Sequence, residues 1–205
     1  SDIGGGSVND DMDEIGYASV GANRGAINRM FMRINGTVAS TVEINDSTTN
    51  GPVLSNSDYF GSSVANIGDL NGDGVNDLAV GARFDDNGDT DSGAIHIMFM
   101  NIDGSVDSTV EINSSTTHGP TLAINDRFGW SVANIGDLNG DGVNDIAVGA
   151  VYDDMDENGN ASGGANRGAI HIMFMNINGT VASTVEINDS TTNGHVLSNS
   201  DYFGS

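Results

Sequence analysis

The stretch that decides the fold, FGSSVANIGDLNGDGVNDLAVGA, runs from Phe60 to Ala82, and a near copy runs from Phe128 to Ala150. At the centre of each copy nine residues are identical, at 69–77 and 137–145. Oxygen-bearing side chains stand at positions 1, 3, 5 and 9 of the nine, and glycines at positions 4 and 6. Hard cations such as Ca²⁺ take roughly six to eight oxygen ligands, and glycine supplies the left-handed backbone that such a tight loop needs. The nine residues therefore predict a calcium loop in each copy.

The expected ligands are the four oxygen-bearing side chains of each loop and the backbone carbonyl at position 7. They are Asp69, Asn71, Asp73, Asp77 and the carbonyl of Val75 in the first loop, and Asp137, Asn139, Asp141, Asp145 and the carbonyl of Val143 in the second. The alternative is a solvated turn, because Asp, Asn and Gly are ordinary turn formers. Identical recurrence of the nine residues, in phase with a longer repeat, favours the cation site.

A helical calcium loop of the EF-hand type begins in the same way but needs an acidic residue at position 12. That position holds Val80 in the first copy and Val148 in the second. Residues 77–81, directly after the loop, are short and β-like, with Gly81 where a helix would have to continue. The sequence therefore places the loop between strands and not between helices.

A longer repeat surrounds these loops. Phe-Gly pairs at Phe60, Phe128 and Phe203 begin successive copies 68 and 75 residues apart. The longer interval contains an insertion between Gly149 and Gly168 in an acidic, Gly/Asn-rich stretch, which identifies that stretch as a surface loop. Self-similarity at such a long period dictates the architecture of the fold.

Each full copy contains four strand-like segments, which in the first full copy are residues 60–70, 77–81, 94–100 and 108–112. The third is apolar on both faces, as expected of a strand covered on both sides, and the fourth alternates like an outer strand. Asn-Gly or Asp-Gly pairs between the third and fourth segments are strong hairpin signals. Four antiparallel strands per radial repeat predict an all-β fold of β-propeller blades, about three of them and so part of a ring.

The motif Phe-Gly-x-Ser-Val-Ala-Asn-Ile-Gly-Asp-Leu-Asn-Gly-Asp-Gly-Val-Asn-Asp, followed by Ala-Val-Gly-Ala, resembles the FG-GAP repeats of the integrin α-subunit propeller and its bacterial relatives. The resemblance covers essentially the whole chain. It implies that the acidic loop joins the first two strands of a blade and binds Ca²⁺. The family name also implies Pro after Gly-Ala, but Arg83 and Val151 stand there, a departure that affects a turn and leaves the loop unchanged.

Aligned on this repeat, the chain divides into four parts. Residues 1–57 are expected to form a partial blade with strands two to four, 58–125 and 126–200 two complete blades with calcium loops, and 201–205 the start of another. Asp2 aligns with the last ligand of a loop whose other ligands are missing, so no site is predicted there. We expect the segment to belong to a longer chain, or to a homo-oligomer or filament.

Composition limits the partners. The formal net charge is −23, with six arginines and no lysine against 29 acidic side chains. This charge argues against nucleic acid or an anionic membrane as a partner, because both need basic patches. No run of 18 apolar residues occurs, and no membrane-inserted segment is predicted. Calcium modules of weak affinity work outside cells, which predicts an extracellular or cell-surface location.

A second acidic series stands between the second and third strands of each copy, at residues 10–14, 85–89 and 153–157. These stretches lack the alternate spacing and fixed glycines of the calcium loops, and we expect them to be solvated. A hydrolase needs two carboxyls held across a pocket in different environments, and nothing in the sequence indicates that one of these is buried. No enzymatic activity is predicted.

Three further side chains are expected to pack. His96 and His171 occupy matching positions in apolar third strands, where Asn28 stands in the first copy, and are interpreted as packed histidines rather than metal ligands. Trp130 replaces Ser62 beside the Phe-Gly pair and is expected at a blade interface.

The sequence thus predicts an extracellular calcium-binding β-propeller segment that serves recognition, adhesion or scaffolding. Resemblance to integrin-like propellers implies a protein or glycan ligand on the face opposite the calcium loops. Two alternatives stay open: a structural subunit of an extracellular filament or surface coat, and a non-catalytic propeller attached to a hydrolase or lyase.

Overall fold

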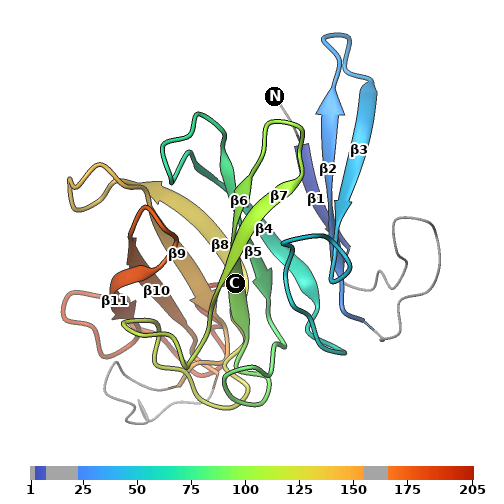
Figure 1. The fold of residues 1–205 in the computed structure, drawn as a ribbon. Coiled ribbons are helices and arrows are strands. Elements are labelled where there is room, and N and C mark those ends of the chain that lie inside the picture. The colour runs from blue at the N-terminus through green and yellow to red at the C-terminus, as the bar shows by residue number, and fades with distance from the viewer. Residues whose placement is uncertain (1–2, 8–22, 155–165) are drawn as a thin grey trace.

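The computed structural model describes residues 3–7, 23–154 and 166–205. In these residues the chain forms eleven β-strands, which stand side by side as three antiparallel sheets (Figure 1). The same residues contain no helix with the length and apolar character needed to cross a membrane.

Strands follow chain order within every sheet. The first sheet contains β1 (Ile3–Ser7), β2 (Ala26–Met32) and β3 (Val38–Ile44); the second contains β4 (Phe60–Gly68), β5 (Asp77–Ala82), β6 (Ala94–Met100) and β7 (Val106–Ile112); the third contains β8 (Phe128–Gly136), β9 (Asp145–Ala150), β10 (Ala169–Met175) and β11 (Val181–Ile187). Four-stranded antiparallel meanders of this kind are propeller blades. The expected all-β class and blade architecture are confirmed.

Strand limits agree with the expected ones to within two residues. β6 spans the seven residues predicted for the third strand, whereas β4 ends at Gly68 instead of Leu70. Gly68 has φ 78°, and its counterpart Gly136 has φ 73°, so the chain leaves the extended conformation there and turns into the acidic loop. β7 begins at Val106, two residues earlier than predicted, because the turn before it is tight.

The β6–β7 turn has three residues. Asn101 N donates to the Ser105 carbonyl at 2.9 Å, which leaves Ile102, Asp103 and Gly104 in the loop. Gly104 N donates back to the Asn101 carbonyl at 3.0 Å, and Gly104 has φ 92°. This is a turn closed by a left-handed glycine, the common three-residue hairpin.

Successive sheets meet backbone to backbone at the Phe-Gly and Gly-Ala dipeptides. A Cβ built on Gly81 of β5 would lie 2.0 Å from the carbonyl oxygen of Gly129 in β8. Ser63 Oγ donates to that same carbonyl at 2.9 Å, and Gly93 forms an isolated parallel bridge with Phe128. The repeated glycines therefore have a packing reason: side chains there would push neighbouring blades apart.

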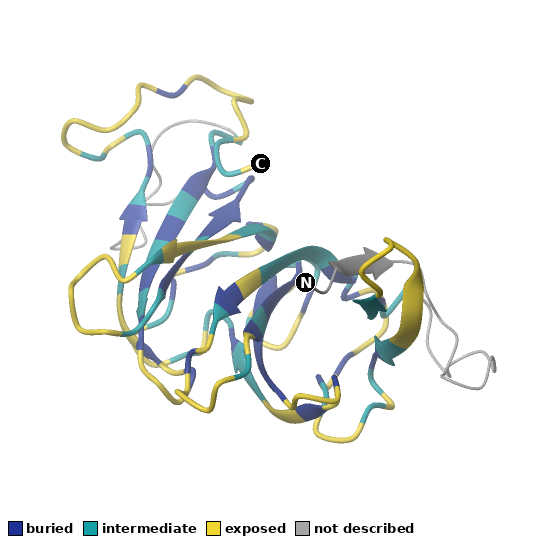
Figure 2. Cartoon of the chain, turned by 90° about the horizontal axis from the view of Figure 1, so that it is seen from above, coloured by how far each residue is buried: buried dark blue, intermediate teal, exposed yellow. Residues whose placement is uncertain are grey.

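The core lies between the sheets, as the burial pattern shows (Figure 2). Alternate residues of β6 point to opposite neighbours, as the pleat of a strand requires. Ile95, Ile97 and Phe99 join a cluster with the third sheet, whereas Met98 and Met100 join one with the first. A fully buried β6 explains why its sequence is apolar on both faces.

Candidate functional site

The two acidic loops join β4 to β5 and β8 to β9. Their glycines adopt the predicted left-handed conformation, with φ 82° and 90° at Gly72 and Gly74, and 81° and 90° at Gly140 and Gly142. A Cβ on any of the four would meet nothing within 4 Å. Backbone conformation, and not lack of space, is therefore what demands glycine in these loops.

The first Asp of each loop folds the loop around its own carboxylate. Asp69 Oδ1 accepts hydrogen bonds from Gly72 N at 2.7 Å and Asp73 N at 2.9 Å, and Oδ2 accepts one from Gly74 N at 2.8 Å. Asp137 makes the same three contacts in the second loop. A carboxylate that accepts several backbone N–H groups is fixed in position before any ligand arrives.

The next two ligand positions continue this pattern. Asn71 Oδ1 accepts from Asp73 N at 3.0 Å, and Asp73 Oδ1 accepts from Val75 N at 2.7 Å. Asn71 Nδ2 also donates to Asp73 Oδ2 at 3.1 Å. The side chains at positions 1, 3 and 5 thus lie on one concave turn of backbone.

The last Asp of each loop is buried. Asp77 Oδ2 accepts from Leu70 N at 2.9 Å, and Oδ1 accepts from Met100 N at 3.0 Å, so Asp77 ties its loop to the end of β6. Asp145 makes the equivalent bonds to Leu138 N and Met175 N. Burial raises the pKa of the Asp77 carboxyl, and the two backbone N–H groups oppose that rise.

The donor set of each loop fits a calcium ion. A carboxylate offers about four acceptor positions on its two oxygens, so Asp77 keeps capacity for a cation beside its two backbone bonds. All the candidate ligand atoms are oxygens, as Ca²⁺ prefers. Proximity of the five ligand groups around one ion stays a prediction.

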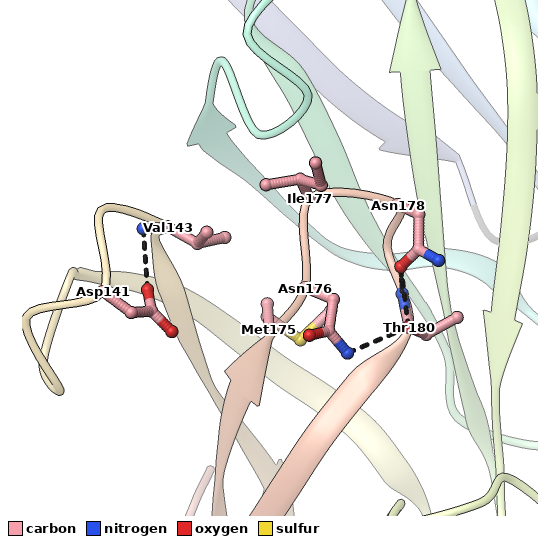
Figure 3. Close-up of a pocket in the computed structure, with 7 residues that line it drawn as sticks. All are labelled: Asp141, Val143, Met175, Asn176, Ile177, Asn178 and Thr180. Carbon is pink, nitrogen blue, oxygen red and sulfur yellow. Dashed lines mark hydrogen bonds between the residues drawn. The ribbon is translucent and has the colours of Figure 1, made fainter.

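The acidic loops and the hairpin turns lie at the same end of a blade. In the third sheet they border a hollow of about 520 Å³, with Asp141 and Val143 on one side and Asn176 to Thr180 on the other (Figure 3). Ile177 at this hairpin tip is exposed.

The acidic stretches at the opposite end correct one expectation. Asp85 and Asp153 were expected in solvated loops, but they are only 1% and 2% exposed. The backbone explains this for Asp85, because its N donates to the Ala82 carbonyl at 3.0 Å and its carbonyl accepts from Gly93 N at 3.1 Å. The residue is thereby held against the ends of β5 and β6. Residues 10–14 and 155–157 of the acidic series lie outside the described residues.

Both strand histidines are buried, as predicted, but they have acidic neighbours. His96 Nε2 lies 4.0 Å from Asp85 Oδ2, and His171 Nε2 lies 3.0 Å from Asp153 Oδ2. A glutamate completes each group, and the three candidate ligand atoms lie within 4.8 Å of one another: Asp85, His96 and Glu111 in one blade, and Asp153, His171 and Glu186 in the next. Sequence reasoning missed these groups because it treated the histidines and the acidic loops separately. Their joint recurrence in two copies was the available signal.

Burial dominates the electrostatics of this end. It raises the pKa of Asp85 to about 7, with the charges of Asp58 and Glu111 adding to the rise. It also raises the pKa of Asp58 to about 6 and that of Asp126 to about 8, and lowers the pKa of His96 to about 4. Several acidic groups are thus held where their charged forms are unfavourable.

Aromatic and arginine side chains line the same end across the blade boundary. The expectation for Trp130 is confirmed, since the guanidinium carbon of Arg83, from the preceding blade, lies 4.5 Å from its ring centroid. The guanidinium carbon of Arg127 lies 4.5 Å from the ring centroid of Phe84 and 4.3 Å from that of Tyr152. Arg83, at the position where the motif name has Pro, therefore supplies an inter-blade cation–π contact.

Comparison with known proteins agrees with the motif. The FG-GAP repeat family model matches residues 60–98 and 128–173. Integrin alpha-3 of Cricetulus griseus is 42% identical over 97 residues, which is 47% of this chain and 9% of the integrin. Integrin alpha-6 of Homo sapiens is 42% identical over 98 residues, 47% of this chain and 8% of that protein. Integrin alpha-PS2 of Drosophila melanogaster is 34% identical over 136 residues, 63% of this chain and 9% of that protein. The matched region is less than a tenth of the length of each of these relatives.

Proposed function

The chain carries FG-GAP repeats of the kind found in integrin α subunits, and we propose that it is a calcium-binding β-propeller segment acting outside the cell in recognition or adhesion. The observation that carries this proposal is the duplicated loop, with its left-handed glycines and its set of oxygen ligands. Two independent copies have the same internal hydrogen bonds.

Calcium would act by stabilising the loop. Asp69 and Asp73 carry like charges on one turn of backbone, and a bound cation offsets their repulsion. Asp77 would transmit the effect to the sheet, because the same carboxylate bonds the buried amide of Met100. The proposed ligands are therefore those predicted from the sequence, with the last one acting also as an anchor.

The proposed binding surface for a protein or glycan is the end opposite the calcium loops. Support comes from the aromatic and arginine side chains that gather there, because Tyr, Trp and Arg are enriched where protein interfaces gain most of their energy. Trp130 and Tyr152 are half-buried, and Tyr202 is exposed. This role requires no catalysis, and we propose a non-enzymatic module.

We also propose that the segment functions within a longer chain or a homo-oligomer. The matched relatives are more than ten times as long as the matched stretch. The first sheet has three described strands where the other two have four, so β1 presents an edge that another strand could pair with.

Calcium titration followed by thermal melting tests the proposal. The wild-type chain should bind two calcium ions by calorimetry and melt at a lower temperature in excess chelator, because a ligand of the folded state stabilises it by mass action. Asp73→Ala and Asp141→Ala should each remove one ion. Asp107→Ala, which removes an exposed carboxylate of β7 outside the loops, is the matched control and should keep both. An unchanged melting temperature in chelator would contradict the assignment.

A further inference from the structure

The pairing of the third and fourth strands brings a histidine and a glutamate onto one face of each complete blade. His96 of β6 stands directly opposite Glu111 of β7, and His171 of β10 opposite Glu186 of β11. Directly opposed residues of an antiparallel pair project to the same side of the sheet. Asp85 and Asp153 reach these pairs from the turns that follow β5 and β9.

The group in the second blade contains buried polar atoms without partners. Among the described residues, neither ring nitrogen of His96 has a hydrogen-bond partner, although the residue is 1% exposed. Asp85 Oδ2, the oxygen that faces His96 Nε2, has none either. Buried polar atoms are nearly always satisfied by protein, water or an ion, so a water or an ion is expected between His96 Nε2 and Asp85 Oδ2.

The distances suit a small tetrahedral ion. Ligands bound at about 2.1 Å around a tetrahedral zinc lie about 3.4 Å apart. The two histidine-to-aspartate distances, 4.0 Å at His96 and 3.0 Å at His171, lie on either side of this value. At His171 the hydrogen bond to Asp153 would give way to two bonds to one metal.

The glutamate of each group is oriented by neighbouring amides. Asn113 Nδ2 donates to Glu111 Oε1 at 2.6 Å, and Asn87 Nδ2 lies 3.1 Å from Oε2. In the next blade Asn188 Nδ2 donates to Glu186 Oε1. Hydrogen bonds of this kind commonly orient carboxylates that bind metals.

The chemistry of the ligands separates these groups from the calcium loops. Calcium takes oxygen ligands only, whereas an imidazole nitrogen with two carboxylates suits Zn²⁺ and neighbouring transition metals. A cavity of about 50 Å³, lined by His171 and Glu186 among others, adjoins the third-blade group. This is room for a water molecule as a fourth ligand, since a water occupies about 30 Å³.

From these observations we propose that each complete blade binds a divalent transition-metal ion, such as Zn²⁺, at the end opposite its calcium loop. The ligands are Asp85, His96 and Glu111 in the second blade and Asp153, His171 and Glu186 in the third. The ion links the turn after the second strand to the third and fourth strands. The proposal does not depend on calcium binding, because the two kinds of site share no residue.

The first sheet provides the matched control within the chain. Its residue at the histidine position is Asn28, which stands opposite Glu43 in the same register. An asparagine at this position is therefore compatible with the blade fold. His96→Asn and His171→Asn introduce the residue that the chain itself uses there.

Zinc titration of the full chain in saturating calcium tests the proposal. The wild type should bind two zinc ions, each single His→Asn variant one, and the double variant none. His118→Asn with His195→Asn, which alters the two loop histidines, should keep both ions, as should Asp73→Ala. Cobalt gives a second readout, because its visible ligand-field absorption should fall by half in each single variant and vanish in the double variant.

Two results would overturn the proposal: a wild-type chain that binds no zinc, or a double variant that keeps the wild-type stoichiometry. If the double variant loses cooperative thermal melting and is therefore misfolded, Glu111→Gln and Glu186→Gln decide the question. These variants preserve shape and should each lose one zinc ion. Retention of both ions in a folded Glu111→Gln, Glu186→Gln chain refutes the assignment.

Discussion

Removal of the Asp77 carboxylate should loosen the loop and the end of β6 even when no calcium is present. Both oxygens of Asp77 accept buried backbone N–H groups, from Leu70 at 2.9 Å and Met100 at 3.0 Å. Asp77→Ala leaves both donors without partners. Asp73, by contrast, is exposed and accepts one backbone bond, from Val75.

The expected size follows from these bonds. A hydrogen bond to a charged group contributes about 1.5–3 kcal/mol, so the two bonds together contribute about 3–6 kcal/mol. Burial raises the pKa of Asp77, which means that the carboxylate is held at a cost, and the net loss belongs at the lower end of that range. A loss of about 3 kcal/mol corresponds to about a hundredfold change in an opening equilibrium. Asp73→Ala should change stability in chelator by no more than about 0.5 kcal/mol, as expected of a surface substitution.

Amide hydrogen exchange in excess chelator measures this directly, since local opening exposes individual amides. In Asp77→Ala the Met100 amide should exchange about a hundredfold faster than in the wild type. The Met175 amide, bonded to the untouched Asp145, serves as the control within the same molecule. Unchanged protection of Met100, or an equal loss in Asp73→Ala, would refute the view that Asp77 is an anchor as well as a candidate ligand.

Two further outcomes are expected. Gly81→Ala should lower the midpoint of urea denaturation by an amount equivalent to about 1–3 kcal/mol. The reason is that the new Cβ would lie 2.0 Å from the Gly129 carbonyl oxygen. A variant as stable as the wild type would show that the blades do not meet there. In metal-free buffer, the free energy of unfolding should fall as the pH rises from about 6.5 to 8. Burial raises the folded-state pKa of Asp85 to about 7 and that of Asp126 to about 8. A carboxyl whose pKa is raised by folding contributes stability that is lost as the pH rises through its folded-state pKa. Burial lowers the pKa of His96 from 6.5 to about 4, so this residue opposes the trend only below pH 6.5. Urea unfolding measured across the range would show a stability that is constant or rises with pH if the carboxyls were solvated.

The sequence was sufficient where local rules determine the structure. The apolar run of β6 predicted a strand covered on both sides, and each of its residues is buried. Gly72 and Gly74 were expected to adopt left-handed backbone conformations because a tight ligand loop requires them, and both do. These features depend on residues close together in the chain, so periodicity and turn chemistry define them.

The histidine groups could not be predicted in this way. An Asp-Asp-Asn-Gly stretch is typical of a solvated turn, and nothing next to Asp85 in the chain indicates its burial. Burial arises because the turn folds back on β5 and β6, so that Asp85 approaches a histidine eleven residues later and a glutamate on a further strand. The apolar neighbours of His96 correctly predicted that this residue is buried. They gave no information about the carboxylates near its imidazole ring.

The two ends of the blades differ in how far the repeats have diverged. At the end with the acidic loops the nine loop residues are identical in both complete blades. At the opposite end one pair of positions differs between copies: the first and third copies have ion pairs there, Arg24 with Asp46 and Arg167 with Asp189. The second copy has Ser92 and Ser114 at those two positions, so both partners are exchanged together. Loss of one partner alone would leave a partly buried charge uncompensated, which explains why both positions of this pair differ together. One end thus varies its side chains between copies while the other end keeps one fixed loop. This is the division expected from the function proposed above, with the partner at the variable end and calcium at the fixed loops.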